Sequence, residues 1–249
     1  MKADSQISQT VSVMFRALCW GVAALAISSC DSAEEPLPVN PDPFCEARPR
    51  LVFCEDFDTA KPPGVFDTRH VDGGSLARTR DEVASIPYAL QAKTPAGRAG
   101  SAVLRKTFGP SRAYRIFLFM RVATPNADAG DVELLSISIE TGSTPYRIGL
   151  GARGDGSWWA HETRGDAVRR FDLTEPFGFD AWRTARFDYE VLDSGKGQLH
   201  VRFGSETALL VDDLTPVIDV APPTFELGPV SRSAAAWQAY YDNITFEMD

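Results

Sequence analysis

The side chains able to do chemistry are few, and they lie outside the patterns that established catalytic sites use. Three histidines occur, His70, His161 and His200, none in a metal-binding or nucleophile motif. Cleavage of a glycosidic bond needs two carboxylates, and the nearest pair, Asp131 and Glu133, is better explained as a solvated strand end. Serine nucleophile elbows, H-E-x-x-H helices and phosphate-binding loops do not occur. We therefore expect no catalysis.

One catalytic alternative stays open. Elimination from an acidic polysaccharide needs a Tyr or His base and an Arg or Gln group that neutralises the sugar carboxylate. The segments Tyr146-Arg147 and Trp158-Trp159-Ala160-His161 offer these residue types without a recognised pattern. A diverged polysaccharide lyase or hydrolase is thus the enzymatic alternative.

The same residues suit binding better than catalysis. Sugars are recognised by flat aromatic rings, with planar polar groups that align their hydroxyls. If the aliphatic side chains of residues 135–150 face a core, a polar face lies opposite and carries Ser136, Ser138 and Arg147. Trp159 and His161 share one parity, so we expect them to flank a shallow groove above the small residues, which include Gly149 and Gly151. Trp158 would then face the core. The alternative is that both tryptophans of the segment only pack.

These side chains must be positioned by β-strands, because hydrophobic residues recur at every second position from residue 51 onward. In residues 113–122, Tyr114, Ile116, Leu118 and Met120 share one face, while Arg115, Phe117, Phe119 and Arg121 share the other. Residues 131–140, 187–191 and 199–203 alternate in the same way. Turn signals separate these segments, among them Gly154-Asp155-Gly156 and Ser194-Gly195. The pattern predicts one all-β domain, an antiparallel two-sheet sandwich over residues 51–249.

Length and charge limit the partners. The chain has 249 residues and a formal net charge of −9. An acidic chain repels phosphate backbones, and no run of five or six Lys or Arg occurs to oppose this. We therefore expect no nucleic-acid partner.

The N-terminal region carries an export signal. An apolar run spans residues 17–27 after Arg16, shorter than the roughly 20 residues that a membrane-spanning helix needs. It ends in Ile27-Ser28-Ser29-Cys30, which resembles the lipobox of bacterial lipoproteins. That resemblance implies a signal peptide over residues 1–29, a palmitate-type lipid anchor on Cys30, and a cell-envelope location facing the periplasm or the exterior. A plain secretory signal or a buried helix is the alternative.

The remaining cysteines and the segment between them suggest a stapled tether. We expect the tether over residues 30–50. Its residues 31–44 hold prolines at positions 36, 38, 41 and 43 among acidic residues, which favours an extended segment with little to bury. Cys45 and Cys54 are an even pair in a chain bound for an oxidising compartment, so we expect a disulfide. A metal site is the alternative, although no histidine lies nearby.

Three short segments together indicate a family. They read FCEDFD at residues 53–58, GRAGSAVL at 97–104 and YDNITF at 241–246. This arrangement resembles the concanavalin A-like lectin/glucanase jelly roll, a group that includes laminin-G-like domains, carbohydrate-binding modules and some glycanases and lyases. The resemblance implies that the first and last strands lie side by side and hold a structural Ca²⁺, with Glu55, Asp56 and Asp242 as its ligands. The alternative is that these acids cap strands or pair with arginine.

The sequence as a whole leads to one functional expectation. We expect a lipid-anchored, exported protein that binds a glycan or glycoconjugate without catalysis, through Ser136, Ser138, Arg147, Trp159 and His161. A structural or assembly lipoprotein that binds protein partners is the alternative from a different class.

Overall fold

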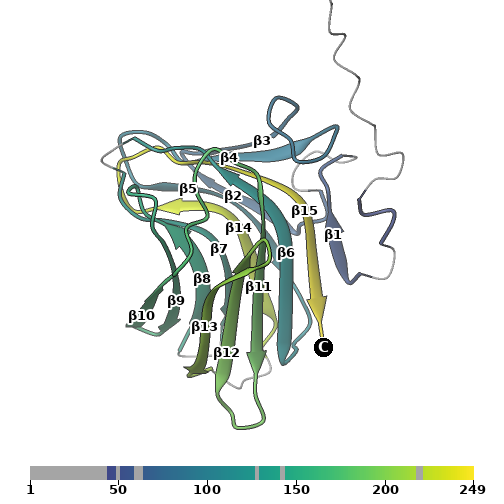
Figure 1. The fold of residues 1–249 in the computed structure, drawn as a ribbon, viewed down its shortest axis with the longest axis vertical. Coiled ribbons are helices and arrows are strands. Elements are labelled where there is room, and N and C mark those ends of the chain that lie inside the picture. Colours follow the sequence, from purple (N-terminus) through teal and green to yellow (C-terminus); the bar gives the residue numbers. More distant parts are fainter. Residues whose placement is uncertain (1–43, 49–50, 59–63, 127–128, 141–143, 217–220) are drawn as a thin grey trace, which may run out of the picture. The chain divides into compact units, whose positions relative to one another are not determined.

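The sandwich predicted from the alternating pattern is confirmed. A computed structural model describes residues 44–48, 51–58, 64–126, 129–140, 144–216 and 221–249. These residues contain fifteen strands in two antiparallel sheets and no helix (Figure 1). The expected signal peptide, Cys30 and the proline-rich tether as far as residue 43 lie outside the described residues.

Sheet A contains eight strands. Its order is β13-β12-β11-β6-β15-β4-β3, and β1 pairs with the far half of β15. The first and last strands are therefore neighbours, as the resemblance implied. The bounds are β1 (Phe53–Glu55), β3 (Ser75–Thr79), β4 (Ala89–Lys93), β6 (Ala113–Val122), β11 (Arg183–Val191), β12 (Gly197–Phe203), β13 (Glu206–Leu214) and β15 (Gln238–Met248).

Sheet B contains seven strands in the order β10-β9-β8-β7-β14-β5-β2. Within it, β14 lies between β7 and β5 although it comes near the end of the chain. The bounds are β2 (Thr68–Asp72), β5 (Gly100–Thr107), β7 (Val132–Ile139), β8 (Tyr146–Ala152), β9 (Trp158–Arg164), β10 (Ala167–Asp172) and β14 (Pro223–Ser231).

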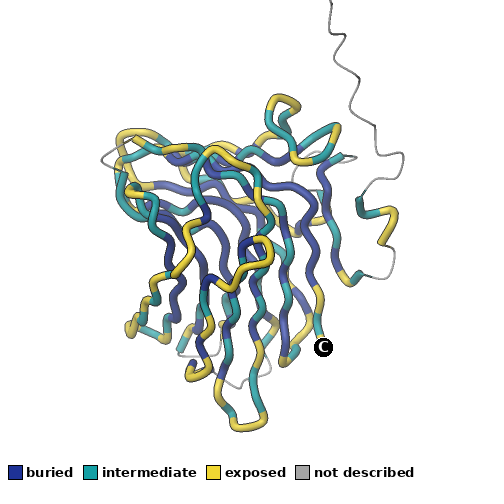
Figure 2. Tube along the Cα trace, viewed as in Figure 1, coloured by how far each residue is buried: buried dark blue, intermediate teal, exposed yellow. Residues whose placement is uncertain are grey.

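The core lies between the two sheets and is formed by the inward-facing side chains of both; Figure 2 marks the buried residues along the strands. In β6 the four residues predicted to face inward are all buried, and the four predicted to face outward are partly exposed. Trp158 is buried against Phe177 and Phe203, as its parity predicted. Burial of this continuous apolar layer, at about 25 cal/mol per Å², is what holds the two sheets together.

The predicted disulfide is also present. Cys45 and Cys54 are joined, with their Cα atoms 5.5 Å apart, and Cys54 lies within β1. The bond ties the segment that precedes the sandwich to its first strand. The described residues include no helix long and apolar enough to cross a membrane.

Candidate functional site

The outer face of sheet B carries a row of polar side chains drawn from neighbouring strands. The cross-strand register aligns one residue from each of six strands, β10, β9, β8, β7, β14 and β5. In that order the row reads Arg170, His161, Gly149, Ser136, Glu226 and Arg105. None of these six residues has an apolar side chain, so the row is suited to polar interactions.

Arg147 lies beside this row and forms the main ion pairs of the face. It lies on β8 between two carboxylates, bonding Glu133 on β7 through Nε at 3.3 Å and through Nη2, and Glu226 on β14 at 2.6 Å. Its Nη1 also donates to Ser138 Oγ at 3.2 Å. The two glutamates raise the pKa of Arg147 against the opposing effect of its burial. The guanidinium therefore stays charged and is fixed in orientation.

Glu133 reaches this face because β7 contains a bulge. Strict alternation from the buried Leu135 would turn Glu133 into the core. The register with β8 shifts between Glu133 and Leu135, and both Leu134 and Leu135 are buried. An inserted residue of this kind reverses the alternation of side chains across the bulge, so Glu133 faces outward.

His161 lies next to Glu133 in an almost dry environment. Its side chain is 7% exposed, and its Nε2 is 3.3 Å from a Glu133 oxygen. Burial lowers the pKa of His161, with the nearby Arg147 acting in the same direction and Glu133 opposing it. The imidazole is therefore neutral near pH 7. Its Nδ1 is buried and has no hydrogen-bond partner among the described residues.

Trp159 extends the site along β9. Its ring centroid is 5.3 Å from that of His161, and the guanidinium of Arg170 lies over its other side at 4.7 Å. Arg170 also pairs with Asp131. The indole Nε1 is buried, and within the described part of the chain it donates to no acceptor. Each of these two neighbouring rings thus keeps one buried nitrogen unsatisfied, which is uncommon for buried polar atoms.

The structure brings together the five side chains that the sequence nominated for binding. Ser136, Ser138, Arg147, Trp159 and His161 all lie on the outer face of sheet B. We expected these side chains to flank an open groove above the glycines, and that expectation is wrong. The rings fill that space: a β-carbon on Gly149 would lie 2.6 Å from Cε1 of His161, and one on Gly151 would overlap the indole of Trp159.

Sequence reasoning missed four contributors to this site. Glu133, expected at a solvated strand end, is instead mostly buried and pairs with Arg147. Glu226 and Arg105 join it from β14 and β5 and pair with each other at 2.6 Å, and Arg170 joins it from β10. Glu226 is the polar residue of an alternating Phe225-Glu226-Leu227 segment, which was a usable signal for an outward face. Nothing local showed that β14 would lie beside β7.

The three predicted calcium ligands lie near the junction of β1 and β15, and most of their oxygens are already engaged. Glu55 accepts hydrogen bonds from the backbone N–H groups of Phe57 and Val65, and Asp56 from those of Cys45 and Asp58. No group of three or more potential metal ligands converges anywhere in the described residues. Backbone capping, the alternative reading, therefore accounts for these two side chains.

Asp242 differs from the other two acids. One oxygen accepts bonds from Ala84 and Ser85, while Oδ1 is buried and has no partner among the described residues. Burial, with a contribution from the nearby Asp58, raises the pKa of Asp242 to about 7. Burial, with contributions from Asp56 and Glu55, raises the pKa of Asp58 to about 6. Crowded carboxylates with a spare oxygen are chemically suited to a hard cation.

Comparisons with known proteins define the fold. No family model and no curated protein sequence matches the chain. Among solved structures, an endo-β-1,4-glucuronan lyase from the fungus Trichoderma reesei is similar with a TM-score of 0.64 and 11% identity, over 80% of this chain and 96% of that one. Cellulose-induced protein Cip1 is similar at 0.57 and 11%, over 78% and 96%.

An alginate lyase, vAL-1 from Chlorella virus, is similar with a TM-score of 0.55 and 11% identity, over 75% of this chain and 94% of that one. The structural neighbours are thus polysaccharide lyases and carbohydrate-active jelly-roll sandwiches. At this identity the likeness establishes the fold, a jelly-roll β-sandwich, and the function must be argued from the site.

Proposed function

We propose that the outer face of sheet B binds a polysaccharide. The observation that carries the proposal is that the neighbouring rings of Trp159 and His161 each hold a buried nitrogen without a partner among the described residues, in the same face as the fixed guanidinium of Arg147. Hydroxyl and carboxylate groups of a sugar supply the partners that these atoms lack. Arg170 stacks on Trp159 from the edge strand β10 and is half-exposed, so it can swing aside when a sugar ring takes its place. Neighbours of the same fold that act on glucuronan and alginate support this choice of ligand class.

A glycan array followed by calorimetry tests this proposal. We expect binding to at least one polysaccharide, weakened about tenfold in Trp159→Phe, because that variant keeps an aromatic ring and loses the N–H donor. Trp182→Phe is the matched control, since Trp182 also has a buried unsatisfied Nε1 but lies directly before β11 of the other sheet. Absence of binding, together with capture of a defined protein partner, would favour the assembly-protein alternative instead.

A diverged lyase is a second candidate, and one observation favours it. His161 is neutral, and its unpaired Nδ1 is available as a base if Nε2 donates to Glu133. Arg147 is close enough in the network to stabilise a sugar carboxylate. All six tyrosines are described, and no tyrosine lies on this face of sheet B, so histidine would have to act alone.

Incubation with glucuronan and alginate separates binding from cleavage. Elimination produces an unsaturated, ultraviolet-absorbing chain end, whereas binding alone releases nothing. We expect no product, in line with a binding protein. Product that disappears in His161→Ala and persists in the control His200→Ala would establish the lyase in its place.

We also propose that the protein is lipid-anchored in the cell envelope through Cys30, with the membrane as a partner. The lipobox-like Ile27-Ser28-Ser29-Cys30 supports this. The disulfide supports an oxidising compartment. Labelling with a palmitate analogue tests it: wild type should incorporate label and Cys30→Ala should not.

We finally propose a structural Ca²⁺ near Glu55, Asp56 and Asp242. The spare Oδ1 of Asp242 and the raised pKa values of Asp58 and Asp242 support a cation there. Glu55 and Asp56 contribute only if they exchange backbone hydrogen bonds for the ion.

A further inference from the structure

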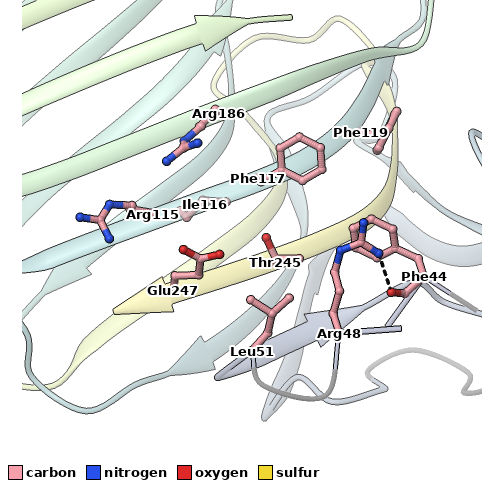
Figure 3. Close-up of a pocket in the computed structure, with 10 residues that line it drawn as sticks. All are labelled: Phe44, Arg48, Leu51, Arg115, Ile116, Phe117, Phe119, Arg186, Thr245 and Glu247. Atoms are coloured by element: carbon pink, nitrogen blue, oxygen red, sulfur yellow. Dashed lines mark hydrogen bonds between the residues drawn. The ribbon is translucent and has the colours of Figure 1, made fainter. Parts of the chain in front are cut away.

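Sheet A carries a cavity of mixed apolar and charged lining on its own outer face. It has a volume of about 540 Å³ and lies over β6, β11 and β15, with one wall formed by the segment that precedes β1 (Figure 3). Small-molecule sites usually enclose about 300–1,000 Å³. The proposed polysaccharide face is on sheet B, so this cavity belongs to a different surface.

The floor of the cavity is set by strand register. Arg186, Phe117 and Thr245 are direct cross-strand partners on β11, β6 and β15. In the next row Arg115 pairs with Glu247. The alternation that buries Ile116 and Leu118 forces Phe117 outward, so an aromatic ring is left partly exposed between an arginine and a hydroxyl.

Three arginines, Arg48, Arg115 and Arg186, line the same cavity. Arg186 bonds Asp188 through Nε at 2.9 Å, which leaves the two Nη groups at the far end of its side chain for other acceptors. Arg115 pairs with the exposed Asp249 near the chain end. Figure 3 shows both arginines with Glu247 at one end of the cavity, and Arg48 at the other end. The cavity therefore offers several hydrogen-bond donors for an anion and one carboxylate acceptor.

The remaining wall is held in place covalently. Arg48 stacks on Phe44 at 3.7 Å and donates to its carbonyl at 2.8 Å. The disulfide between Cys45 and Cys54 links this short segment to β1. A wall fixed in this way is preorganised, which lowers the entropic cost of binding.

We propose that this cavity binds a carboxylated sugar unit, a uronic acid. Its carboxylate is recognised by Arg186 and Arg115, because guanidinium groups bind carboxylates through paired N–H donors. The C–H face of its ring packs on Phe117, and its hydroxyls donate to Glu247 and Thr245. This site is additional to the polysaccharide face on sheet B and does not depend on it.

Calorimetry on the full chain, with a glucuronic acid trisaccharide and the neutral cellotriose as probes, tests the proposal. We expect the acidic probe to bind at least tenfold more tightly and to lose affinity as salt rises. Phe117→Ala and Arg186→Met should each weaken binding fivefold or more. Arg112→Met is the matched control, since Arg112 pairs with a fully exposed Asp193 away from the cavity lining.

Two further measurements keep the outcome independent of the sheet B site. Hydrogen–deuterium exchange should show protection by the acidic probe at residues 44–48, 113–119 and 244–249. Trp159→Phe should leave protection at these three segments unchanged, whatever it does to binding at sheet B. Equal affinity for cellotriose, protection confined to β8 and β9, or loss of protection at the three segments in Trp159→Phe would each overturn the proposal. If Phe117→Ala is unfolded by circular dichroism, Arg186→Met alone decides.

Discussion

Gly149 leaves the space that the imidazole of His161 occupies. A β-carbon at residue 149 would lie 2.6 Å from Cε1 of that ring and 3.1 Å from a Glu133 oxygen. The glycine therefore fixes where the histidine lies, and the ion pairs of Glu133 depend on the same space.

Gly149→Ala tests this relationship. The added methyl group should displace His161, cost about 1–3 kcal/mol of unfolding free energy through overpacking, and weaken polysaccharide binding. Thermal melts and calorimetry measure the two effects. Gly109→Ala is the control, because nothing lies within 4 Å of its added carbon. Unchanged binding in Gly149→Ala would separate His161 from the ligand.

Removal of the Arg147 side chain should lower the free energy of unfolding more than is usual for a partly exposed arginine. Arg147→Ala leaves the carboxylates of Glu133 and Glu226 facing each other without their shared cation. Among the described residues the two carboxylates then keep only Arg105 and His161 as ion-pair partners, and the loss of their bonds to Arg147 in a mostly buried network should cost about 1–3 kcal/mol, which chemical denaturation measures. Arg112→Ala, which breaks an exposed pair, should change stability by less than about 1 kcal/mol. Similar small losses in both variants would show that the network contributes no stability.

The raised pKa of Asp242 predicts a pH dependence with a definite sign. In the folded state this pKa is about 7, against 3.8 for the ordinary side chain, so the folded state holds the proton more tightly. Stability from this group is therefore present at low pH and is lost as the pH rises from about 4 to about 7. Melting temperatures of wild type should fall more steeply over that interval than those of Asp242→Asn. The exposed Asp166→Asn should follow wild type, and parallel curves for all three proteins would contradict the prediction.

Added Ca²⁺ should reverse that loss. A cation beside Asp242 and Asp58 offsets the cost of ionising both carboxylates, so the melting temperature near pH 7.5 should rise with Ca²⁺. Asp242→Asn should respond less, and Mg²⁺, which demands a tighter octahedral geometry, should act weakly. A wild-type titration that shows neither heat nor a melting shift would remove calcium from this site.

Much of the fold follows from the sequence because alternation is a local property. The two-sheet sandwich, the inward face of β6, the burial of Trp158 and the disulfide were all predicted from residues close together in the chain. The shared outer face of β7, β8 and β9 was predicted for the same reason, since these strands follow one another through short connections.

The rest of the site depends on pairing between distant segments. Glu226 meets Ser136 because β14 lies between β7 and β5, and no local pattern specifies that order. Glu133 turns outward only because of the bulge before Leu135, which simple alternation does not reveal. Whether Trp159 borders a groove or fills it depended on the ring's position over Gly151, a tertiary packing feature.

The disulfide also sets how the sandwich would bear mechanical load. If the chain is anchored at Cys30, tension reaching Cys45 passes directly through the sulfur bridge to Cys54, bypassing residues 46–53. The force then acts on β1, whose antiparallel pairing with β15 spans Phe53 to Glu55. Detachment of the first strand, instead of gradual unravelling of the segment before it, becomes the event that limits how hard the domain can be pulled.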